Sequence, residues 1–356
     1  MIDPKQQSLF DVQNGKFPST RYQGSKQKFI EWIWLCLKDV KFTTCLDAFG
    51  GTGCFAFKAK QERKSVTYND LLPFNAIIGK ALIENQGTKL TESDVQYLLD
   101  IDALREAPTF IEDTFHDIYY TDEENRWLDR VSYRIRKMED EYKKAMAYFA
   151  LFQACIIKRP YNLFHRKNLY VRMQDVERSF GNKKTWDTPF PVHFKKFVKE
   201  VNAASFNSGI KCSSQCGDAL SVSGDFDLVY IDTPYIGANG KCVDYADFYH
   251  FLDGIAQYDN WAKMIDDASL HKRLKRVDNP WCDKNRITSE FEKLFSHFSK
   301  SALAISYRSD GIPSVEQLVE MLRVLYRNVK VSESWEIKYA LSKSRSKEVL
   351  LLATNL

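Results

Sequence analysis

The sequence lacks the features that mark membrane, secreted and metal-binding proteins. No apolar run approaches the roughly 18 residues that span a bilayer, and the polar stretch 1–10 has no basic-then-apolar signal layout. The eight cysteines include no CxxC pair, so we expect neither a disulfide framework nor a zinc site. Even the closest pair, Cys212 and Cys216, is interpreted as two reduced thiols. We therefore expect a cytoplasmic protein without a metal and without a membrane partner.

The sequence also contains no internal repeat and no low-complexity linker, and its composition is that of a globular protein. The 356 residues are 44% hydrophobic and 14% aromatic, enough for one large domain or two modest ones. The net charge is only +4, but residues 90–130 hold twelve acids against three arginines, and residues 158–200 hold eleven cations against four acids. This segregation favours a basic face for a polyanion, although two ordinary solvated helical surfaces are the alternative.

The N-terminal third reads as the opening of a nucleotide-binding βαβ unit. An apolar strand, Thr43 to Phe49, runs into Gly50-Gly51-Thr52-Gly53 and then a helical pattern over 55–61. A second short strand ends in Asp70, which lies 17 residues beyond Gly53, near the spacing at which an acid meets ribose hydroxyls. Position 56 is Ala, a variant that dinucleotide motifs tolerate, so NAD stays open here. No Gly-Lys-Ser/Thr follows, which excludes a Walker loop.

The central candidate site is the stretch 227–235, Asp-Leu-Val-Tyr-Ile-Asp-Thr-Pro-Tyr. Its apolar first half predicts a buried strand, which Pro234 ends. The strand delivers the Asp232 carboxylate, the Thr233 carbonyl and the Tyr235 ring to its carboxyl end, where open α/β sheets bind ligands. Two acceptors and a stacking face suit a planar base that carries an exocyclic amine. The alternative is a strand followed by a turn with a surface acid.

A second candidate site is a run in which cations and aromatic residues alternate. A long amphipathic helix is predicted over 141–157 and leads into the run 158–168, and residues 180–186 repeat the mixture. Cations there could contact phosphates, while aromatic and amide groups stack on bases or read their edges. The residues that we expect to contact DNA are Lys158, Arg159, Asn162, His165, Arg166, Lys167, Asn168, Lys183 and Lys184.

The remaining pattern predicts an α/β fold at both ends of the chain with a mostly helical insertion between them. Further helices are expected over 29–37, 73–85, 287–300 and 315–327, a strand over 302–307, and a closing antiparallel pair over 330–338 and 348–353. A polar-aromatic segment, 244–254, leads into another helix.

Taken in order, these motifs resemble the α-class DNA adenine-N6 methyltransferases, which use S-adenosylmethionine. The resemblance covers nearly the whole chain and is carried by residues 21–26, 47–53, 69–70, 216–218, 232–235 and 339–343. It implies a class I methyltransferase, Rossmann-like sheet, mostly parallel with an antiparallel last strand. The cofactor-binding catalytic domain would comprise 1–85 and 212–356, with a helical, basic target-recognition insertion at 86–211. The recognition region precedes the Asp-Thr-Pro-Tyr motif, as in the α arrangement.

The resemblance also implies a role for each matched residue. Tyr22 and Lys26 would hold the adenine-side wall and the carboxylate end of the cofactor, and its methionine moiety would be lined by Phe49, Gly51 and Gly53. Asp70 would bind the ribose hydroxyls, and Asp218 would lie near the adenine. Asp47 and Asp232 complete the expected cofactor-binding residues. For Asp218, an ordinary Gly-Asp turn is an equal alternative. Family members commonly have proline where this chain has Thr233, a position that contributes only its carbonyl.

The implied reaction is direct methyl transfer to the N6 amine of an adenine flipped out of double-stranded DNA. Asp232 and the Thr233 carbonyl would accept the amine hydrogens, Pro234 would fix the loop, and Tyr235 would stack on the base. No Pro-Cys pair occurs, which disfavours a cysteine nucleophile. The alternatives are methylation of RNA or of a protein amide, and a DNA-binding regulator that keeps the fold without turnover. A cognate restriction endonuclease is a candidate partner, and the oligomeric state is open.

Overall fold

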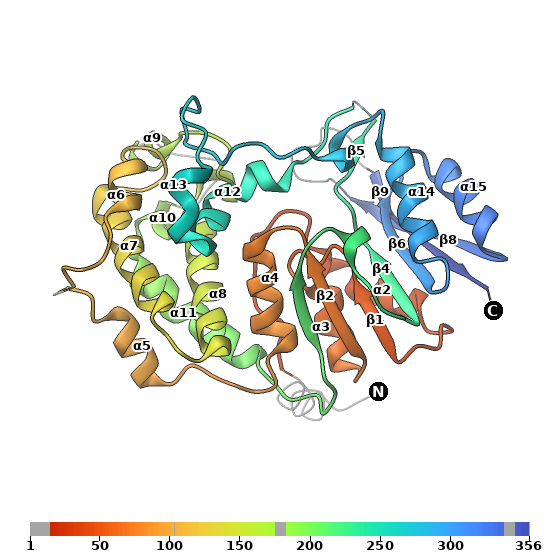
Figure 1. The fold of residues 1–356 in the computed structure, drawn as a ribbon, viewed down its shortest axis with the longest axis horizontal. Helices are drawn as coiled ribbons and strands as arrows, with labels where there is room; N and C mark the ends of the chain where they lie inside the picture. Colours follow the sequence, from red (N-terminus) through yellow and green to blue (C-terminus); the bar gives the residue numbers. More distant parts are fainter. Residues whose placement is uncertain (1–14, 103, 175–182, 239, 338–345, 356) are drawn as a thin grey trace. The chain divides into compact units, whose positions relative to one another are not determined.

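A computed structural model describes residues 15–102, 104–174, 183–238, 240–337 and 346–355. Its contacts divide the chain into two compact units (Figure 1). The helical unit comprises Met1–Tyr22, Lys80–Asn207 and Ala246–Arg276, and the sheet unit comprises Gln23–Gly79, Ser208–Tyr245 and Val277–Leu356. The stretch 1–10 and the motif segments 180–182 and 339–343 lie outside the described residues.

The sheet unit is built on seven strands in the order β3-β2-β1-β4-β6-β9-β8. Their bounds are β1 (Thr44–Asp47), β2 (Ser65–Asp70), β3 (Ser213–Cys216), β4 (Leu228–Ile231), β6 (Ala302–Arg308), β8 (Asn328–Ile337) and β9 (Ser346–Thr354). A separate short ladder joins β5 (Ile236–Gly237) to β7 (Gly311–Ile312). In the seven-stranded sheet, β9 is antiparallel to both β6 and β8, whereas the other pairs of this sheet are parallel. The predicted mostly parallel sheet with an antiparallel last strand is confirmed.

Helices cover both faces of this sheet because successive strand side chains point to opposite sides. Val229 and Ile231 of β4 belong to a core cluster with Phe291 and Leu322, whereas Tyr230 stacks on Phe55 with ring centroids 4.0 Å apart. The helices of this unit are η1 (Lys26–Lys28), α2 (Ile30–Cys36), α3 (Cys54–Gln61), α4 (Pro73–Gly79), η4 (Ala219–Ser221), η6 (Pro280–Cys282), α14 (Ile287–His297) and α15 (Val315–Leu325). Phe55 lies on α3, and Phe291 and Leu322 lie on α14 and α15.

The helical unit is organised around α8 (Glu141–Ile157). Every residue of α8 from Ala145 to Ile157 is buried, so the predicted bounds are confirmed but the predicted amphipathic character is wrong. The other elements are η2 (Lys80–Glu84), α5 (Glu92–Leu99), α6 (Phe110–Thr114), α7 (Asp122–Arg136), η3 (Pro160–Asn162), α9 (Leu169–Met173), α10 (Lys183–Asp187), α11 (Phe190–Ala204), most of α12 (Tyr245–Ala256), η5 (Tyr258–Asn260) and α13 (Trp261–Met264).

The division into units differs from the sequence interpretation at three short stretches, 15–22, 80–85 and 208–211, and above all at residues 246–276. The interpretation puts residues 246–276 in the catalytic domain, because they follow the Asp-Thr-Pro-Tyr strand. In the structure they pack with the helices: the Phe164 amide donates to the Phe248 carbonyl at 2.9 Å, and Phe251 lies among Phe115, Tyr119 and Phe164. An aromatic helix face is buried by whichever unit offers a matching core, and local sequence does not show which.

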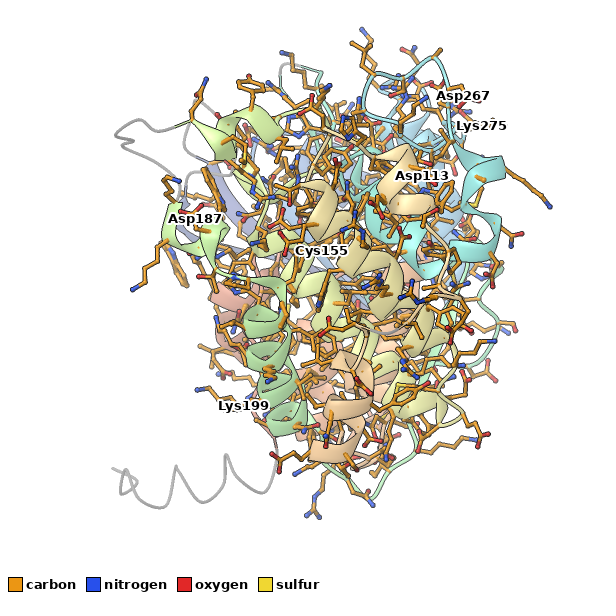
Figure 2. All side chains as sticks on the ribbon, turned by 90° about the vertical axis from the view of Figure 1, so that its left-hand side faces the viewer. Asp113, Cys155, Asp187, Lys199, Asp267 and Lys275 are labelled. Carbon is orange, nitrogen blue, oxygen red and sulfur yellow. A yellow bond between two sulfur atoms is a disulfide. The ribbon has the colours of Figure 1, made fainter. Side chains whose placement is uncertain are left out.

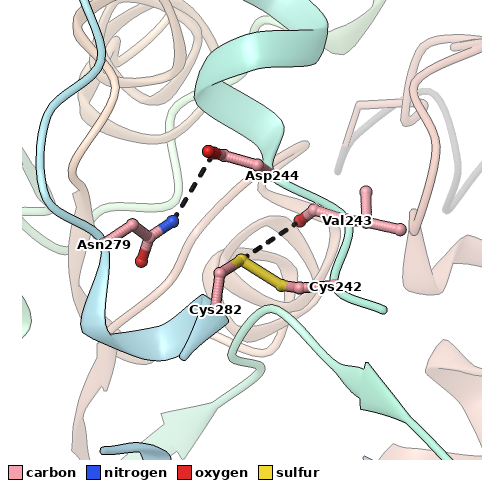
Figure 3. The surroundings of a disulfide bond; sticks show 5 residues. All are labelled: Cys242, Val243, Asp244, Asn279 and Cys282. Carbon is pink, nitrogen blue, oxygen red and sulfur yellow. Dashed lines mark hydrogen bonds between the residues drawn. A yellow bond between two sulfur atoms is a disulfide. The ribbon is translucent and has the colours of Figure 1, made fainter. Parts of the chain in front are cut away.

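One disulfide departs from the expectation of reduced cysteines. Cys242 and Cys282 are joined across 40 residues of sequence (Figure 3). Beside the bond, Asn279 donates a long hydrogen bond of 3.5 Å to Asp244. Because the partners are far apart in the chain, no spacing pattern indicates the pair.

Among the described residues, no group of acids, histidines and cysteines could hold a metal, and none of the helices has the length and apolar character of a membrane span.

Candidate active site

Three strand ends meet at one edge of the sheet. Strand β1 lies between β2 and β4 and is parallel to both, with Asp47 in register with Tyr68 and Tyr230. The glycine turn after β1, Asp70 at the end of β2 and Asp232 after β4 therefore lie at the same edge. A hydrogen bond of 2.8 Å from the Gly51 amide to Asp70 Oδ2 ties the first two together. This is the convergence that the order of the motifs predicts.

The glycine turn needs its glycines for two different reasons. Gly51 and Gly53 have φ values of 52° and 74°, in the left-handed region that favours glycine. At Gly50 a Cβ atom would lie 2.1 Å from the ring of Tyr68, which is fully buried. The Tyr68 hydroxyl in turn donates to the Gly51 carbonyl at 2.7 Å, so the turn is held closely against β2.

Asp47 is a buried acid with one free acceptor. Its Oδ2 accepts from the Ala56 amide at 3.2 Å, and its Oδ1 has no hydrogen-bond partner among the described residues. Burial, and then the nearby Asp232 carboxylate, raises the pKa of Asp47 well above its usual range. A buried acceptor of this kind is suited to a hydrogen-bond donor or a cation brought by a ligand.

The other expected cofactor contacts on the sheet unit line the same edge. Asp70 accepts from the Gly51 and Leu72 amides, and burial raises its pKa. Asp218 is exposed, and its side chain caps η4 by accepting from the Leu220 amide at 2.9 Å. Phe49 meets Trp281 edge to face at 5.2 Å.

Asp232 belongs to a cluster of four polar side chains, two of them acids. The Lys26 ammonium lies 3.1 Å from Asp232 Oδ1 and 3.1 Å from Glu348 Oε1, and donates to the Tyr235 hydroxyl at 2.6 Å. That hydroxyl donates in turn to Asp232. The sequence interpretation puts Lys26 at the carboxylate end of the cofactor, but here its ammonium is used within the protein. Side-chain exposure is 5% for Lys26, 0% for Glu348 and 18% for Asp232.

The cluster changes the protonation of its members. Burial, together with repulsion from the Glu348 carboxylate, raises the pKa of Asp232 to about 6. The attraction of the Lys26 ammonium opposes both effects and lowers this pKa. Burial alone would lower the pKa of Lys26, but Asp232 and Glu348 together outweigh it and raise this pKa. The nearby Tyr245 has its pKa raised by burial and by Asp232. At neutral pH the cluster thus holds an ionised Asp232 and a protonated Lys26.

The rest of the Asp-Thr-Pro-Tyr motif is packed into the sheet unit. Thr233 is buried, and its hydroxyl has no hydrogen-bond partner among the described residues. Pro234 is partly buried, and the Tyr235 ring meets the ring of Tyr307 edge to face at 5.5 Å. Tyr22 belongs to the helical unit, where its ring stacks on Tyr249 at 4.4 Å.

Glu348 is the residue of this cluster that the sequence interpretation missed. It lies on β9 next to the buried run from Val349 to Leu351. An acid directly before an apolar run in β9 is the signal that could have identified it, because acids are almost never fully buried unless they are paired. Tyr245, which follows the Asp-Thr-Pro-Tyr motif in the chain and is linked to Asp232 electrostatically, was also missed.

Several residues expected to contact DNA are instead part of the helical core. The buried Lys158 donates to the carbonyls of Trp186 and Thr188, both at 2.6 Å, and pairs with Glu124 at 2.9 Å. The buried Arg159 guanidinium binds the carbonyl of Tyr119 at 3.0 Å and the side chain of the buried Asn168. We therefore assign Lys158, Arg159 and Asn168 to the fold and not to a DNA-binding surface.

The other members of this set reach the surface to different degrees. Arg166, Lys167, Lys183 and Lys184 are exposed, and Asn162 and His165 are partly buried. Arg166 donates to His165 at 2.8 Å, and burial together with Arg166 lowers the pKa of His165 to about 4. Exposed cations of this kind remain available to phosphates.

A further basic segment was missed, although its composition marks it. Residues 272–276 read Lys-Arg-Leu-Lys-Arg. They return from an exposed turn in which Leu270 is 87% exposed, and an isolated bridge joins Ile265 to Leu274. Lys275 and Arg276 are exposed. Figure 2 shows Lys275 and Asp267 at one end of the helical unit and Lys199 towards the other end. We call residues 265–276 the basic hairpin.

Comparison with known proteins gives one family and several relatives. The family model described as D12 class N6 adenine-specific DNA methyltransferase matches residues 22–321. Type II methyltransferase M2.HphI of Haemophilus parahaemolyticus is 29% identical, over 97% of this chain and 100% of its own length. Type II methyltransferase M.NlaIII of Neisseria lactamica is 24% identical over 84% of this chain and 86% of its own length. Modification methylase LlaI of Lactococcus lactis subsp. lactis is 24% identical over 85% of this chain but 48% of its own length. The matched range includes Lys26, Asp47, Asp70 and Asp232 but ends before Glu348.

Proposed function

This chain belongs to the D12 class of N6 adenine-specific DNA methyltransferases, and from that premise we propose that S-adenosylmethionine is its methyl donor and that Asp232 to Tyr235 form its catalytic motif. The observation that carries the proposal is the meeting of the glycine turn, Asp47, Asp70 and Asp232 at one edge of one sheet. The sheet unit would bind the donor, and the helical unit would recognise the DNA target.

The residues at this edge suit the proposed donor. The donor carries a sulfonium, an ammonium and ribose hydroxyls, and when bound it supplies an electrophilic methyl group. The partnerless Oδ1 of Asp47 is a buried acceptor for a cationic or donor group, and Asp70 is an acid suited to hydroxyls. The absence of side chains at Gly51 and Gly53 allows the backbone to approach a ligand closely. These residues therefore fit S-adenosylmethionine as the bound methyl donor.

Asp232 acts on the acceptor amine. An adenine flipped out of the duplex would present its N6 hydrogens to the Asp232 carboxylate and the Thr233 carbonyl. Accepting both hydrogens draws the nitrogen lone pair out of conjugation with the ring, so that it can attack the methyl carbon. The amine would lose one proton as the new N–C bond forms and the S–C bond to the transferred methyl group breaks, which leaves a neutral thioether. With a pKa of about 6, Asp232 is charged before transfer and basic enough to receive that proton.

DNA contact is assigned to the exposed cations of the helical unit. Arg166, Lys167, Lys183 and Lys184 remain from the sequence interpretation, and the basic hairpin adds Lys275 and Arg276. Such cations hold a duplex by its phosphates without reading its sequence.

A methyl-transfer assay with labelled donor tests the proposal. We expect label on unmodified DNA and little on DNA whose target adenines already carry N6-methyl groups. Asp232→Asn should abolish transfer while donor binding persists. Label found in RNA or protein instead, or transfer by the variant within a few-fold of the unsubstituted enzyme, would refute the assignment.

We further propose that the protein is the modification partner of a restriction endonuclease, as the modification methylases among its relatives suggest. DNA from a host that expresses the chain should resist one sequence-specific endonuclease. Resistance that persists in a host expressing Asp232→Asn would contradict this.

A further inference from the structure

Glu348 is an acid whose side chain is fully buried. Its side chain is 0% exposed on β9, where its amide donates to the Ser334 hydroxyl at 3.0 Å. A buried carboxylate is costly unless it is paired. Its partner is Lys26, the same ammonium that contacts Asp232. The site thus contains a second acid that the Asp-Thr-Pro-Tyr motif does not include.

The geometry separates the two acids. A lysine ammonium has three N–H donors, and those of Lys26 face Asp232, Glu348 and the Tyr235 hydroxyl. Of the two carboxylates, only that of Asp232 is partly exposed, at 18% against 0%. A substrate amine can therefore reach Asp232 but not Glu348.

The charges give this arrangement a consequence. Two carboxylates and one ammonium leave the cluster with one excess negative charge, whereas Lys26 and Asp232 alone would form a neutral pair. During transfer positive charge would move from the sulfur of the donor to the amine nitrogen next to Asp232, so a net negative cluster stabilises the transition state more than a neutral one. Sharing Lys26 with Glu348 also leaves the lone pairs of Asp232 more available to the amine.

We propose that Glu348 is a positioning residue for methyl transfer: it holds the Lys26 ammonium and offsets its charge, so that the negative charge of Asp232 is not cancelled by Lys26 where it faces the substrate amine. The inference rests on the proposed function of Asp232. It extends that function to a residue outside the range that the family model matches.

A purely structural role predicts a different response. If Glu348 served only the fold, replacing it with the isosteric Gln would lower stability and donor binding together with activity. On the charge argument, Glu348→Gln leaves Lys26 paired with Asp232, so the fold loses no essential partner. The rate falls because Asp232 now neutralises the ammonium alone.

The pH profile distinguishes these roles further. The groups whose electrostatic or hydrogen-bonding influence links them to Asp232 are Lys26 of η1, Asp47 of β1, Cys54 of α3, Tyr230 of β4, Tyr235, Tyr245 and Glu348 of β9. Of these, Glu348 raises the pKa of Asp232 and Lys26 lowers it. Removing the Glu348 charge should therefore move the acid limb of the rate to lower pH, even as the plateau falls.

The experiment compares Glu348→Gln with the full-length enzyme in single-turnover methyl transfer from pH 5 to 9. We expect the plateau rate to fall roughly 10- to 100-fold, with an acid limb shifted to lower pH. Donor affinity, DNA affinity and melting temperature should stay close to those of the unsubstituted enzyme. Glu333→Gln is the matched control, because Glu333 is an exposed acid on neighbouring β8 paired with Lys347, and it should leave rate and profile unchanged.

An unchanged rate and acid limb in Glu348→Gln would overturn the inference, and so would a loss of rate that follows a loss of folding or donor binding. Asp232→Asn is assayed in parallel. If that variant is inactive while Glu348→Gln is fully active, the inference fails and the proposed function stands. If Asp232→Asn is active, the proposed function itself fails.

Discussion

The chemistry of individual residues here depends on the balance of charge around one lysine. Lys26 is buried yet has a raised pKa, because two carboxylates outweigh the penalty of burial. Asp232 has its pKa raised to about 6, so within the physiological range it is an anion that can still bind a proton. Both properties come from contacts between segments far apart in the chain, and neither follows from the local sequence.

The raised pKa of Asp232 predicts the pH dependence of the reaction. Below about pH 6 the acid is already protonated and cannot take up the proton that the amine loses, so the transfer rate should rise through that pH and level off above it. Stability runs the other way: the ordinary pKa is 3.8, so the folded protein binds the proton more tightly, and this group costs stability as pH rises between the two values. Single-turnover rates across pH check the first statement. A rate independent of pH between 5 and 7 would contradict it.

Removing Lys26 should be worse for folding than removing the carboxylate of Asp232. Lys26→Met leaves the Asp232 and Glu348 carboxylates together without their ammonium, which should cost roughly 3–5 kcal/mol of unfolding free energy. Asp232→Asn leaves Lys26 paired with Glu348, so its unfolding free energy should match or exceed that of the unsubstituted enzyme. Urea titration of both variants at pH 7.5 measures the difference. Equal destabilisation by the two would mean that the charge balance described here is wrong.

At the scale of elements, the glycine turn between β1 and α3 is fixed by packing as well as by backbone conformation. Gly50→Ala places a methyl group against the buried Tyr68 ring, 2.1 Å away. We expect a loss of about 1–3 kcal/mol in unfolding free energy and a weaker affinity for the methyl donor, measured by calorimetry. Gly209→Ala is the control for a loss of stability without a steric clash: its φ of 75° is unfavourable for alanine, and no atom lies within 4 Å of the added Cβ. It should lose stability without losing donor affinity. Equal affinity for the methyl donor in the two variants would show that the glycine turn does not contribute to the donor site.

The elements also show what the sequence can reveal. Strand β4, helix α8 and the strand-end positions of Asp70 and Asp232 were predictable, because each is encoded by a local apolar run and the residue that ends it. Glu348 and the Cys242–Cys282 pair were not, because their partners lie far away in the chain. Lys158 and Arg159 were misplaced for a related reason: a charge pattern does not show which cations the core uses to satisfy buried carbonyls and acids.

At the scale of the molecule, the question is which of the many cations attract DNA. The net charge of +4 is too small to decide it, so position and exposure must. The basic hairpin combines exposed Lys275 and Arg276 with the exposed Leu270. Arg273 of the same hairpin pairs with Asp266 at 3.1 Å and its side chain is only 24% exposed, whereas Arg276, which pairs with Asp247 at 3.6 Å, is 65% exposed and therefore more available.

Lys275→Ala with Arg276→Ala should weaken DNA binding and reduce its salt dependence. The slope of log K against log salt should become shallower by about 0.9 for every phosphate that the protein no longer binds, and thus by about 1.8 if both cations bind phosphate. Affinity for the methyl donor should not change. Lys199→Ala is the control, because Lys199 is an exposed lysine towards the other end of the helical unit (Figure 2), and its slope should equal that of the unsubstituted enzyme. If Lys199→Ala reduces the slope as much per charge removed as the hairpin variant does, DNA responds to the overall charge of the unit and the hairpin has no special role. If only the hairpin variant does, the phosphates lie along residues 265–276, a segment that the sequence interpretation assigned to the catalytic domain.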